Sequence, residues 1–408
     1  MCLQSRCESL DSPRMAKVRI RAGHVRPLWA GHPWVYAQAV AGLDGTASAG
    51  DLVDVVDPHG HFLGAGFYAP DSALAVRILT REQGRAIDLA FFEERLRAAH
   101  ELRTQWARVP RADTTGYGLV HAEGDGLPGL IVDVYGDSAT VQLLTAGMKQ
   151  RQDHIFSALR AVLPLARVIE MPSREHQEQE GFKVEPRVVF GDSDADLVFW
   201  EHGFEYRLPF ASAQKTGYYF DQRDNRARLE ALCRGRRVLD LCTYVGSFAL
   251  AAARGGAREV LAIDRSEWAL TIARQGAERA GLPQLQFQQK ELKHVLPELI
   301  AQKQRFEVIV MDPPKLAHSV KQLDRARSMY RTWNAQALSL CEPGALLVTC
   351  SCSGAMQPVD FVRTLALAGA DAGRQVTLLT LGEQAADHPT PAAFQEGRYL
   401  KTAFVRVT

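Results

Sequence analysis

The chain lacks long apolar runs and a strong net charge, and both absences exclude large classes of protein. No stretch approaches the ~18 consecutive apolar residues that a membrane-spanning helix needs, and the first residues, MCLQSRCESLDSPR, have no apolar core of the signal-peptide kind. We therefore expect a cytoplasmic protein without membrane contacts. Lys and Arg number 48 and Asp and Glu 47, so the formal net charge of +1 gives no global attraction to nucleic acid.

Cysteine is scarce, and its spacing is irregular. The seven cysteines stand at positions 2, 7, 233, 242, 341, 350 and 352, an odd number without the C-x-x-C pairs of a zinc site. This pattern predicts free thiols in a reducing compartment and no bound metal.

The chain has 408 residues, a length sufficient for two or three domains. The periodicity of its apolar residues changes from one segment to the next. Short β-like runs broken by Gly, Pro and Asp fill residues 15–90 and predict a small β-barrel or sandwich. Residues 91–203 open with a helical pattern and mix both periodicities, which indicates a central α+β domain. In 204–408 strands and helices alternate regularly from Arg237, which predicts a doubly wound parallel sheet ending in two strands without a long helix between them.

A basic run opens the first domain. It consists of Arg14, Lys17, Arg19, Arg21 and Arg26, with no acid among them. Such a run can contact RNA phosphates, but a solvated strand face or tail has the same composition. The sequence leaves these two interpretations open.

The first motif of the α/β domain is a loop between a strand and a helix. The strand RVLDL runs into the turn C-T-Y-V-G, so Asp240 ends the strand and Gly246 lies where the backbone must approach a ligand closely. Only one of the three glycines of G-x-G-x-x-G is present, which argues against a nicotinamide cofactor. The next strand, EVLAID, ends in Asp264, where an acid can accept both ribose hydroxyls of an adenosine. Alternatively, Asp264 caps the helix that begins at Ser266.

A second motif follows the apolar strand FEVIVM. This strand delivers Asp312 at its carboxyl end, followed by Pro313 and Pro314, which stiffen the turn. A D-P-P after a buried strand is typical of methyltransferases that act on nucleic-acid bases or amino groups. Asp312 could hydrogen-bond the exocyclic amine of cytosine, while the two prolines border the ring.

The third motif is ALLVTCSCS. Strand alternation puts Cys350 and Cys352 on one face, so periodicity alone does not choose between them. Ligands bind beyond the carboxyl ends of the strands, which favours Cys352 as the reactive thiol and Cys350 as a small buried side chain.

From about Arg19 to its last residue, the chain resembles the bacterial ribosomal large-subunit RNA cytosine-5 methyltransferases of the methyltransferase I type. The matching segments are GHPWVYAQAV, HAEGDGLPGLIVDVYG, KTGYYFDQRDNR, VLDLCTYVGSFAL, DPPKLA, SCSGAM, AADHP and EGRYLKTAFVRV. The resemblance implies an N-terminal PUA domain, a central α+β domain and a Rossmann-like catalytic domain. It also implies S-adenosyl-L-methionine as cofactor and 23S ribosomal RNA as substrate, and it leaves a homodimer open.

The resemblance also assigns roles to single residues. It makes Cys352 the nucleophile and Asp312 the catalytic acid of D-P-P, and it places Asp240, Tyr244, Gly246 and Asp264 at the cofactor.

Three further assignments concern the edges of the site. Arg223 falls in a segment beside the methionine end of the cofactor, so its guanidinium could bind the carboxylate. The third strand lacks its usual final aspartate, which leaves Glu291 as the nearest acid for the adenine. Lys215, with Arg223 and Arg226, could contact RNA phosphates or could only order the loop and cofactor.

In the implied reaction Cys352 attacks C6 of cytosine so that C5 becomes nucleophilic. The sequence does not name the base that removes the C5 proton; water, Asp312 and His388 are candidates. Methylation of a guanine nitrogen, which needs no nucleophilic cysteine, is a second enzymatic interpretation. A third is a non-catalytic RNA-binding assembly factor, which intact Asp240, Asp264 and Cys352 argue against.

Overall fold

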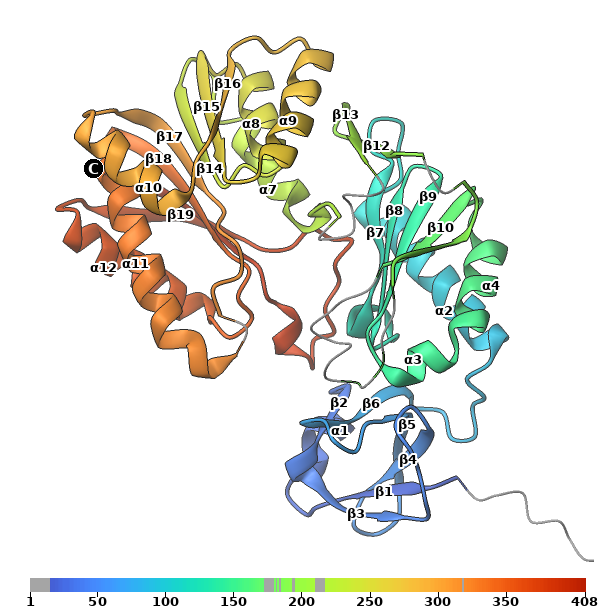
Figure 1. Ribbon diagram of the computed structural model, residues 1–408. Helices are drawn as coiled ribbons and strands as arrows, with labels where there is room; N and C mark the ends of the chain where they lie inside the picture. Colours follow the sequence, from blue (N-terminus) through green and yellow to red (C-terminus); the bar gives the residue numbers. More distant parts are fainter. Residues whose placement is uncertain are drawn as a thin grey trace, which may run out of the picture.

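The computed structural model describes residues 15–171, 180, 182, 185–192, 195–209, 217–317 and 319–408, which form three domains in chain order (Figure 1). The N-terminal domain is built from β1 (Lys17–Ile20), α1 (Val25–Trp29), β2 (Trp34–Tyr36), β3 (Val40–Asp44), β4 (Leu52–Val56), β5 (Phe62–Tyr68) and β6 (Leu74–Thr80). Its strands form one sheet in the order β2-β6-β5-β4-β1-β3. Alternation within β1 buries Val18 and Ile20 and exposes Lys17 and Arg19. The predicted small β domain is therefore confirmed.

The central domain begins with a helix at the predicted place. Its elements are α2 (Leu89–Leu102), β7 (Gly116–His121), β8 (Leu130–Tyr135), β9 (Ser138–Leu143), α3 (Ala146–Gln150), α4 (Gln152–Val162), β10 (Arg167–Glu170) and β11 (Arg187–Phe190). The Asp88 carboxylate caps α2 by accepting a 3.0 Å hydrogen bond from the Phe91 amide. The sheet order is β11-β10-β9-β8-β7, and Phe92 and Leu96 of α2 join Ile155 and Leu159 of α4 in its core.

A hairpin connects the central domain to the third domain. It consists of β12 (Leu197–Glu201) and β13 (Phe204–Leu208), so the boundary predicted between residues 203 and 204 falls on its turn. Thr115 of the central domain donates an amide hydrogen bond of 2.8 Å to the Trp200 carbonyl. On the other side, Phe199 and Tyr206 pack in one core with residues of the helix that follows the second strand of the third domain. The hairpin thus packs against both the central and the third domain.

The third domain is the predicted α/β unit. Its strands are β14 (Arg237–Leu241), β15 (Glu259–Asp264), β16 (Leu285–Gln289), β17 (Phe306–Met311), β18 (Cys341–Ser351), β19 (Val376–Gly382) and β20 (Lys401–Val407). Its helices are α7 (Arg223–Glu230), α8 (Ser247–Arg254), α9 (Glu267–Arg279), α10 (Leu292–Ala301), α11 (Leu323–Ser339) and α12 (Pro358–Asp371). Val308 and Val310 of β17 pack beneath α7 and α8, whereas Ile309 and Met311 face α10 to α12. In the described parts of the chain, no helix is long and apolar enough to cross a membrane.

The strand order of this sheet determines where a ligand can bind. The order is β16-β15-β14-β17-β18-β20-β19, so the direction of winding reverses between β14 and β17. β14 to β18 run parallel, while β20 lies antiparallel between β18 and β19. The two final strands are present without a long helix between them, but the last one makes the sheet mixed rather than purely parallel. Ligands of doubly wound sheets bind beside the carboxyl ends at such a reversal.

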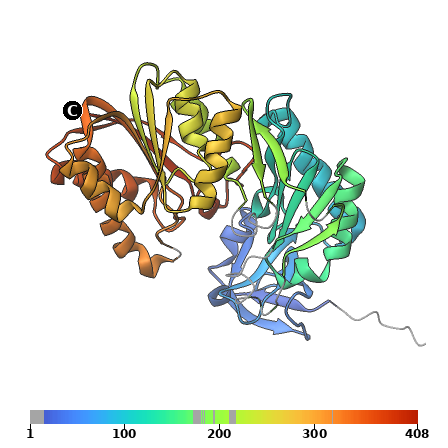
Figure 2. The ribbon, with the colours of Figure 1, turned by 45° about the horizontal axis from the view of Figure 1, so that its top comes forward.

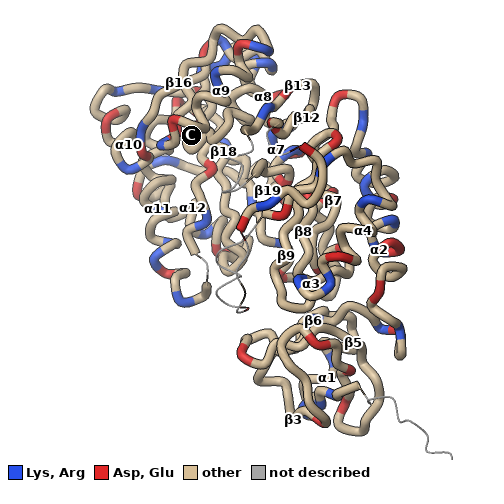
Figure 3. Tube along the Cα trace, turned by 45° about the vertical axis from the view of Figure 1, so that its right-hand side comes forward, with Lys and Arg blue, Asp and Glu red and all other residues tan. Residues whose placement is uncertain are grey.

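The loop of residues 383–400, between β19 and β20, reaches across to the other domains (Figures 1 and 2). The ring of Phe394 lies 4.6 Å from that of Trp34 in the N-terminal domain. Trp34 in turn donates a 2.7 Å hydrogen bond from Nε1 to Glu123 of the central domain. All three domains therefore meet around this loop. Lys and Arg are interspersed with Asp and Glu over all of them (Figure 3).

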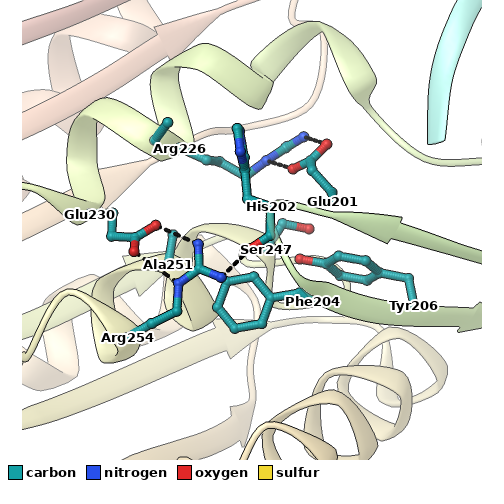
Figure 4. A pocket seen from close by; sticks show the side chains of 10 residues that line it. Glu201, His202, Phe204, Tyr206, Arg226, Glu230, Ser247, Ala251 and Arg254 are labelled. Atoms are coloured by element: carbon teal, nitrogen blue, oxygen red, sulfur yellow. Dashed lines mark hydrogen bonds and ion pairs between the residues drawn. The ribbon is translucent and has the colours of Figure 1, made fainter. Parts of the chain in front are cut away.

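Two ion pairs at the junction of the hairpin with α7 and α8 differ in burial (Figure 4). Arg226 donates hydrogen bonds of 2.7 and 2.8 Å to both oxygens of Glu201, and the two side chains are only 5% and 3% exposed. Arg254 binds Glu230 with the same geometry at 2.8 and 2.7 Å, but these side chains are 34% and 27% exposed. Only the first pair is shielded from water.

We expect Glu201→Gln to destabilise the protein by about 3–5 kcal/mol, because it leaves the buried Arg226 charge uncompensated. The matched variant Glu230→Gln should lower the free energy of unfolding by about 0–1 kcal/mol, because water and salt screen the more exposed pair. Urea unfolding followed by circular dichroism measures both. If both variants lowered the urea midpoint by the same amount, burial would not make the Glu201–Arg226 pair more important for stability than the exposed pair.

Candidate active site

The loop between β14 and α8 has a constrained backbone. Cys242 and Tyr244 adopt the left-handed region, with φ of 62° and 51°, and Gly246 follows with φ of 81°. Side-chain-bearing residues are strained in this region, and such strain concentrates at functional sites. A Cβ on Gly246 would lie 2.8 Å from Cβ of Ala273. The glycine therefore allows α8 to pack against α9, and its approach to a ligand stays a prediction.

Asp264 orients this loop from the end of β15. Its Oδ2 accepts a 2.9 Å hydrogen bond from the Tyr244 amide, and its Oδ1 accepts a 2.8 Å bond from the Ser266 amide. The N-cap of α9 is Ser266, whose hydroxyl accepts from the Ala269 amide at 3.3 Å. Asp264 is thus not the capping residue itself. Each of its carboxylate oxygens retains acceptor capacity for a ligand hydroxyl.

Asp240 supplies an unmet acceptor beneath the loop. It is 1% exposed; the Thr243 hydroxyl donates to Oδ2, whereas Oδ1 is buried without a hydrogen-bond partner. Burial, with smaller contributions from Asp312 and Asp264, raises the pKa of its carboxyl to about 7. A buried acceptor without a donor is uncommon in native structures. The arrangement fits a ligand that brings a cationic amine.

Aromatic rings line the same loop. The Tyr244 hydroxyl donates a 2.6 Å hydrogen bond to the Gly217 carbonyl, and its ring lies 5.4 Å from that of Tyr219 and 6.1 Å from that of Trp268. These mutually inclined rings offer apolar surface beside the loop that Asp264 binds.

Glu291 lies at the N-cap of α10, after β16. Its side chain is 49% exposed and forms a 2.8 Å ion pair with Lys293. The structure thus places it at the next strand end, on the solvent side and paired within its own helix.

Asp312 follows β17, next to the end of β14. Its amide donates a 3.3 Å hydrogen bond to the Leu241 carbonyl, and its Oδ2 accepts a 3.1 Å bond from Nε2 of Gln222. Burial, and then the charge of Asp221, raise its pKa to about 7. Pro313 is buried and Pro314 exposed, so only the first proline lies against the protein interior.

The two candidate cysteines occupy different environments. Cys350 lies inside β18, paired with Thr402 of β20, and is fully buried; Cys352 follows the last residue of β18 and is partly exposed. Burial, then the charges of Asp312 and Asp221, raise the pKa of the Cys352 thiol to about 12. Cys352 and Asp312 therefore follow adjacent strand ends and interact electrostatically, while the Cys350 side chain is hydrogen-bonded to Asp312.

Arg223 is bound at the junction with the central domain. Its guanidinium is buried and donates 2.9 Å hydrogen bonds to the Gly116 carbonyl and to Oδ2 of Asp387. Both partners lie at the junction with the central domain, and a contact of Arg223 with a ligand carboxylate stays a prediction. Arg226 is likewise engaged with Glu201, which favours a structural role over a phosphate contact. Lys215 lies outside the described residues.

The segment that precedes Arg223 contributes groups to which the sequence assigned no role. Gln222 donates to Asp312, and Asp221 acts electrostatically on both Asp312 and Cys352. Their only signal was the segment KTGYYFDQRDNR, which carries the family resemblance. On β20, buried Lys401 donates 2.7 Å bonds to the carbonyls of Ser353 and Tyr399, and burial lowers its pKa to about 8.

His388, a candidate base, is held at the junction with the central domain. Its Nδ1 lies 3.1 Å from Oδ1 of Asp387, and its ring lies 4.9 Å from that of His121. Burial opposes protonation of His388, but Asp387 outweighs burial and raises its pKa.

Comparisons with known proteins identify the domains and the family of the chain. The PUA-like domain family matches residues 18–81, and the S-adenosylmethionine-dependent methyltransferase family matches residues 185–390. A ribosomal RNA large subunit methyltransferase I from Erwinia tasmaniensis is 37% identical over 388 residues, covering 94% of this chain and 98% of that protein. The protein of the same name from Aeromonas hydrophila subsp. hydrophila is 37% identical over 395 residues, covering 96% and 99%.

Solved structures share the arrangement of all three domains. A Streptococcus mutans protein described as a SAM-dependent methyltransferase matches with a TM-score of 0.83 at 19% identity, covering 96% of this chain and 100% of that one. A protein described as a methyltransferase and solved with SAH matches over the same shares with a TM-score of 0.84, also at 19% identity. At this identity the likeness concerns the fold.

The buried Asp240 carboxyl predicts a pH-dependent stability. Its pKa of about 7 lies above the ordinary value of 3.8, so the unfolded chain loses this proton at lower pH than the folded protein. Folding therefore becomes less favourable as the pH rises from about 4 to about 7. We expect Asp240→Asn to gain stability relative to the unsubstituted protein across this window, by on the order of a few kcal/mol.

Urea midpoints measured at intervals from pH 4 to pH 8 check this expectation. The variant Glu278→Gln, on the exposed part of α9, controls for the loss of one negative charge. Parallel pH profiles for Asp240→Asn and the unsubstituted protein would contradict a raised pKa at this position.

Proposed function

Because the chain belongs to the S-adenosylmethionine-dependent methyltransferases named ribosomal RNA large subunit methyltransferase I, we propose that it methylates C5 of a cytosine in 23S ribosomal RNA through a covalent bond from Cys352 to C6. One observation carries the cytosine-C5 chemistry. A partly exposed thiol and a carboxyl group, Cys352 and Asp312, follow adjacent parallel strands and interact electrostatically. Methylation of a guanine nitrogen needs no such thiol.

The cofactor would be held by the loop after β14. The unpartnered Oδ1 of Asp240 suits the ammonium group, and Asp264 suits the ribose hydroxyls, with the Tyr244 ring beside them. A contact between Glu291 and the adenine stays a prediction. When bound, S-adenosylmethionine supplies an electrophilic methyl group on a sulfonium.

The nucleophile and the acid would act on the pyrimidine ring as a pair. C5 of cytosine is a weak nucleophile, so the Cys352 sulfur first adds to C6 and shifts electron density to C5. As the C6–S bond forms, the sulfur gives up its proton and N3 of the ring gains one. Asp312 can relay this proton, because its pKa of about 7 populates both protonation states near neutral pH. Gln222, which donates to Asp312, keeps the carboxyl in place.

The target base is normally stacked in RNA and must be extruded into the site, which costs a few kcal/mol. Contacts elsewhere can offset this cost. The N-terminal domain exposes Lys17 and Arg19 along β1, and Trp29 at the end of α1 is 78% exposed. Exposed basic side chains and an exposed indole are the groups with which RNA phosphates and an unpaired base can dock.

Covalent trapping tests the cysteine mechanism. The protein is incubated with S-adenosylmethionine and ribosomal RNA that carries 5-fluorocytosine, whose fluorine blocks the final elimination. We expect an RNA-linked band in denaturing electrophoresis that is absent in Cys352→Ala and retained in Cys350→Ala. Methyl transfer without any adduct would mean that the target is not cytosine C5.

The docking surface predicts a selective effect of Trp29→Ala. Loss of one base–aromatic stack should raise KM for ribosomal RNA by roughly tenfold, with kcat little changed. Trp106→Ala is the matched control, because Trp106 is 79% exposed but lies in the central domain. Steady-state kinetics of both variants check this, and equal effects on KM would contradict a special role for Trp29.

A further inference from the structure

Asp221 has a buried carboxylate that the steps above do not use. It lies in the short turn Phe220–Gln222 before α7 and is 7% exposed. Its Oδ2 accepts a 2.7 Å hydrogen bond from the Tyr399 hydroxyl, whereas its Oδ1 is buried and has no hydrogen-bond partner. Leaving a buried carboxylate oxygen unpaired is costly, so the arrangement needs an explanation beyond stability.

The position of Asp221 relates it to the reacting groups. Its neighbour Gln222 donates to Asp312, and Asp221 itself raises the pKa of both Asp312 and the Cys352 thiol. After burial, Asp312 and Asp221 are the strongest influences on that thiol. Asp312 and Cys352 come from strand ends, whereas Asp221 comes from the segment that leads into α7. The three groups therefore enter one site from different elements.

The proposed reaction still requires a group that removes the C5 proton. After methylation, C5 carries both a hydrogen and a methyl group, while Cys352 is bonded to C6. Asp312 is engaged with the ring nitrogen and amine, and His388 is held by Asp387 at the junction with the central domain. We propose that Oδ1 of Asp221 is the general base that takes the C5 proton, with the Tyr399 hydroxyl positioning the carboxylate. This assignment rests on the proposed cytosine-C5 mechanism.

The step balances in atoms and electrons. The carboxylate of Asp221 takes the proton from C5, the electron pair of the C5–H bond forms the C5–C6 double bond, and the C6–S bond breaks to release the Cys352 thiolate. The N3 proton returns through Asp312 to the sulfur. The proton left on Asp221 is the one that methyl transfer releases overall, and it passes to water when the product leaves.

Asp221→Asn tests the assignment, because the amide keeps the shape of the carboxylate but takes up no proton. With natural cytosine-containing RNA and methyl-labelled cofactor, we expect the variant to accumulate an RNA-linked protein band that carries the methyl label. Turnover should fall by about 10²–10⁴-fold, the usual contribution of a general base. The band should disappear in the double variant Asp221→Asn/Cys352→Ala. Asp224→Asn, on the exposed side of α7, is the matched control and should turn over without accumulating the band.

Tyr399→Phe separates positioning from folding. In a single turnover with RNA that carries tritium at C5 of cytosine, methyl transfer should proceed while tritium release lags behind it. A purely structural defect would slow both events together. If Asp221→Asn fails to fold, as judged by far-UV circular dichroism, or fails to bind S-adenosylmethionine, the Tyr399→Phe measurement tests the role of Asp221 in its place.

The outcomes distinguish the two proposals. If the 5-fluorocytosine adduct forms but Asp221→Asn turns over natural RNA without a labelled band, Asp221 is not the base and the cysteine mechanism stands. Tritium release that keeps pace with methyl transfer in Tyr399→Phe would likewise overturn the role of the Asp221–Tyr399 pair. If no adduct forms with either RNA while methyl transfer continues, the cytosine-C5 mechanism itself is wrong.

Discussion

The buried ion pair between Arg223 and Asp387 holds the segment on which the candidate site depends. Arg223 follows directly after Asp221 and Gln222, and its guanidinium is bound to Asp387 and to the Gly116 carbonyl of the central domain. The strand ends alone would supply a thiol and a carboxyl group. The segment anchored by Arg223 adds the groups that orient that carboxyl and face the thiol. Docking of the central domain is therefore part of building the site.

Further hydrogen bonds offset part of the cost of burying this pair. The Gly118 amide donates a 2.9 Å hydrogen bond to Oδ2 of Asp387, and Arg103 donates a 2.7 Å bond to its carbonyl. Arg103 is itself paired with Asp125. Burial opposes ionisation of Asp387, but Arg223 and His388 outweigh it and lower the pKa below its ordinary range. Such networks seldom stabilise a fold more than apolar packing would, but they define one relative placement of the parts they join.

Sequence patterns are local, so they predict the ends of single strands but not the contacts between distant segments. Asp240, Asp264, Asp312 and Cys352 each end or follow an apolar strand, and a parallel sheet brings such ends together, so their clustering could be predicted. The role of Arg223 could not, because its partner Asp387 lies 164 residues further along the chain.

Two other features of the fold, at Gly246 and in the β12–β13 hairpin, also depend on contacts between distant segments. Gly246 was predicted to approach a ligand; a side chain there would also meet Ala273, a contact that no local pattern reveals. Hairpin β12–β13 has the pattern of a domain edge, but its aromatic residues pack into two domains at once. Periodicity describes which side of an element is apolar; it does not say which domain covers that side.

The protonation states at rest suggest how the proposed chemistry would select its base. The Cys352 thiol has a pKa of about 12, so it becomes a nucleophile only when its proton has an acceptor. Cytosine offers N3 as that acceptor, and Asp312, with a pKa of about 7, can carry the proton there. Uracil carries a hydrogen on N3, so its acceptor would be O4 instead. A thiol kept neutral by burial depends on a proton path that leads to the acceptor of the bound base, so the surroundings of the cysteine would contribute to specificity as well as to rate.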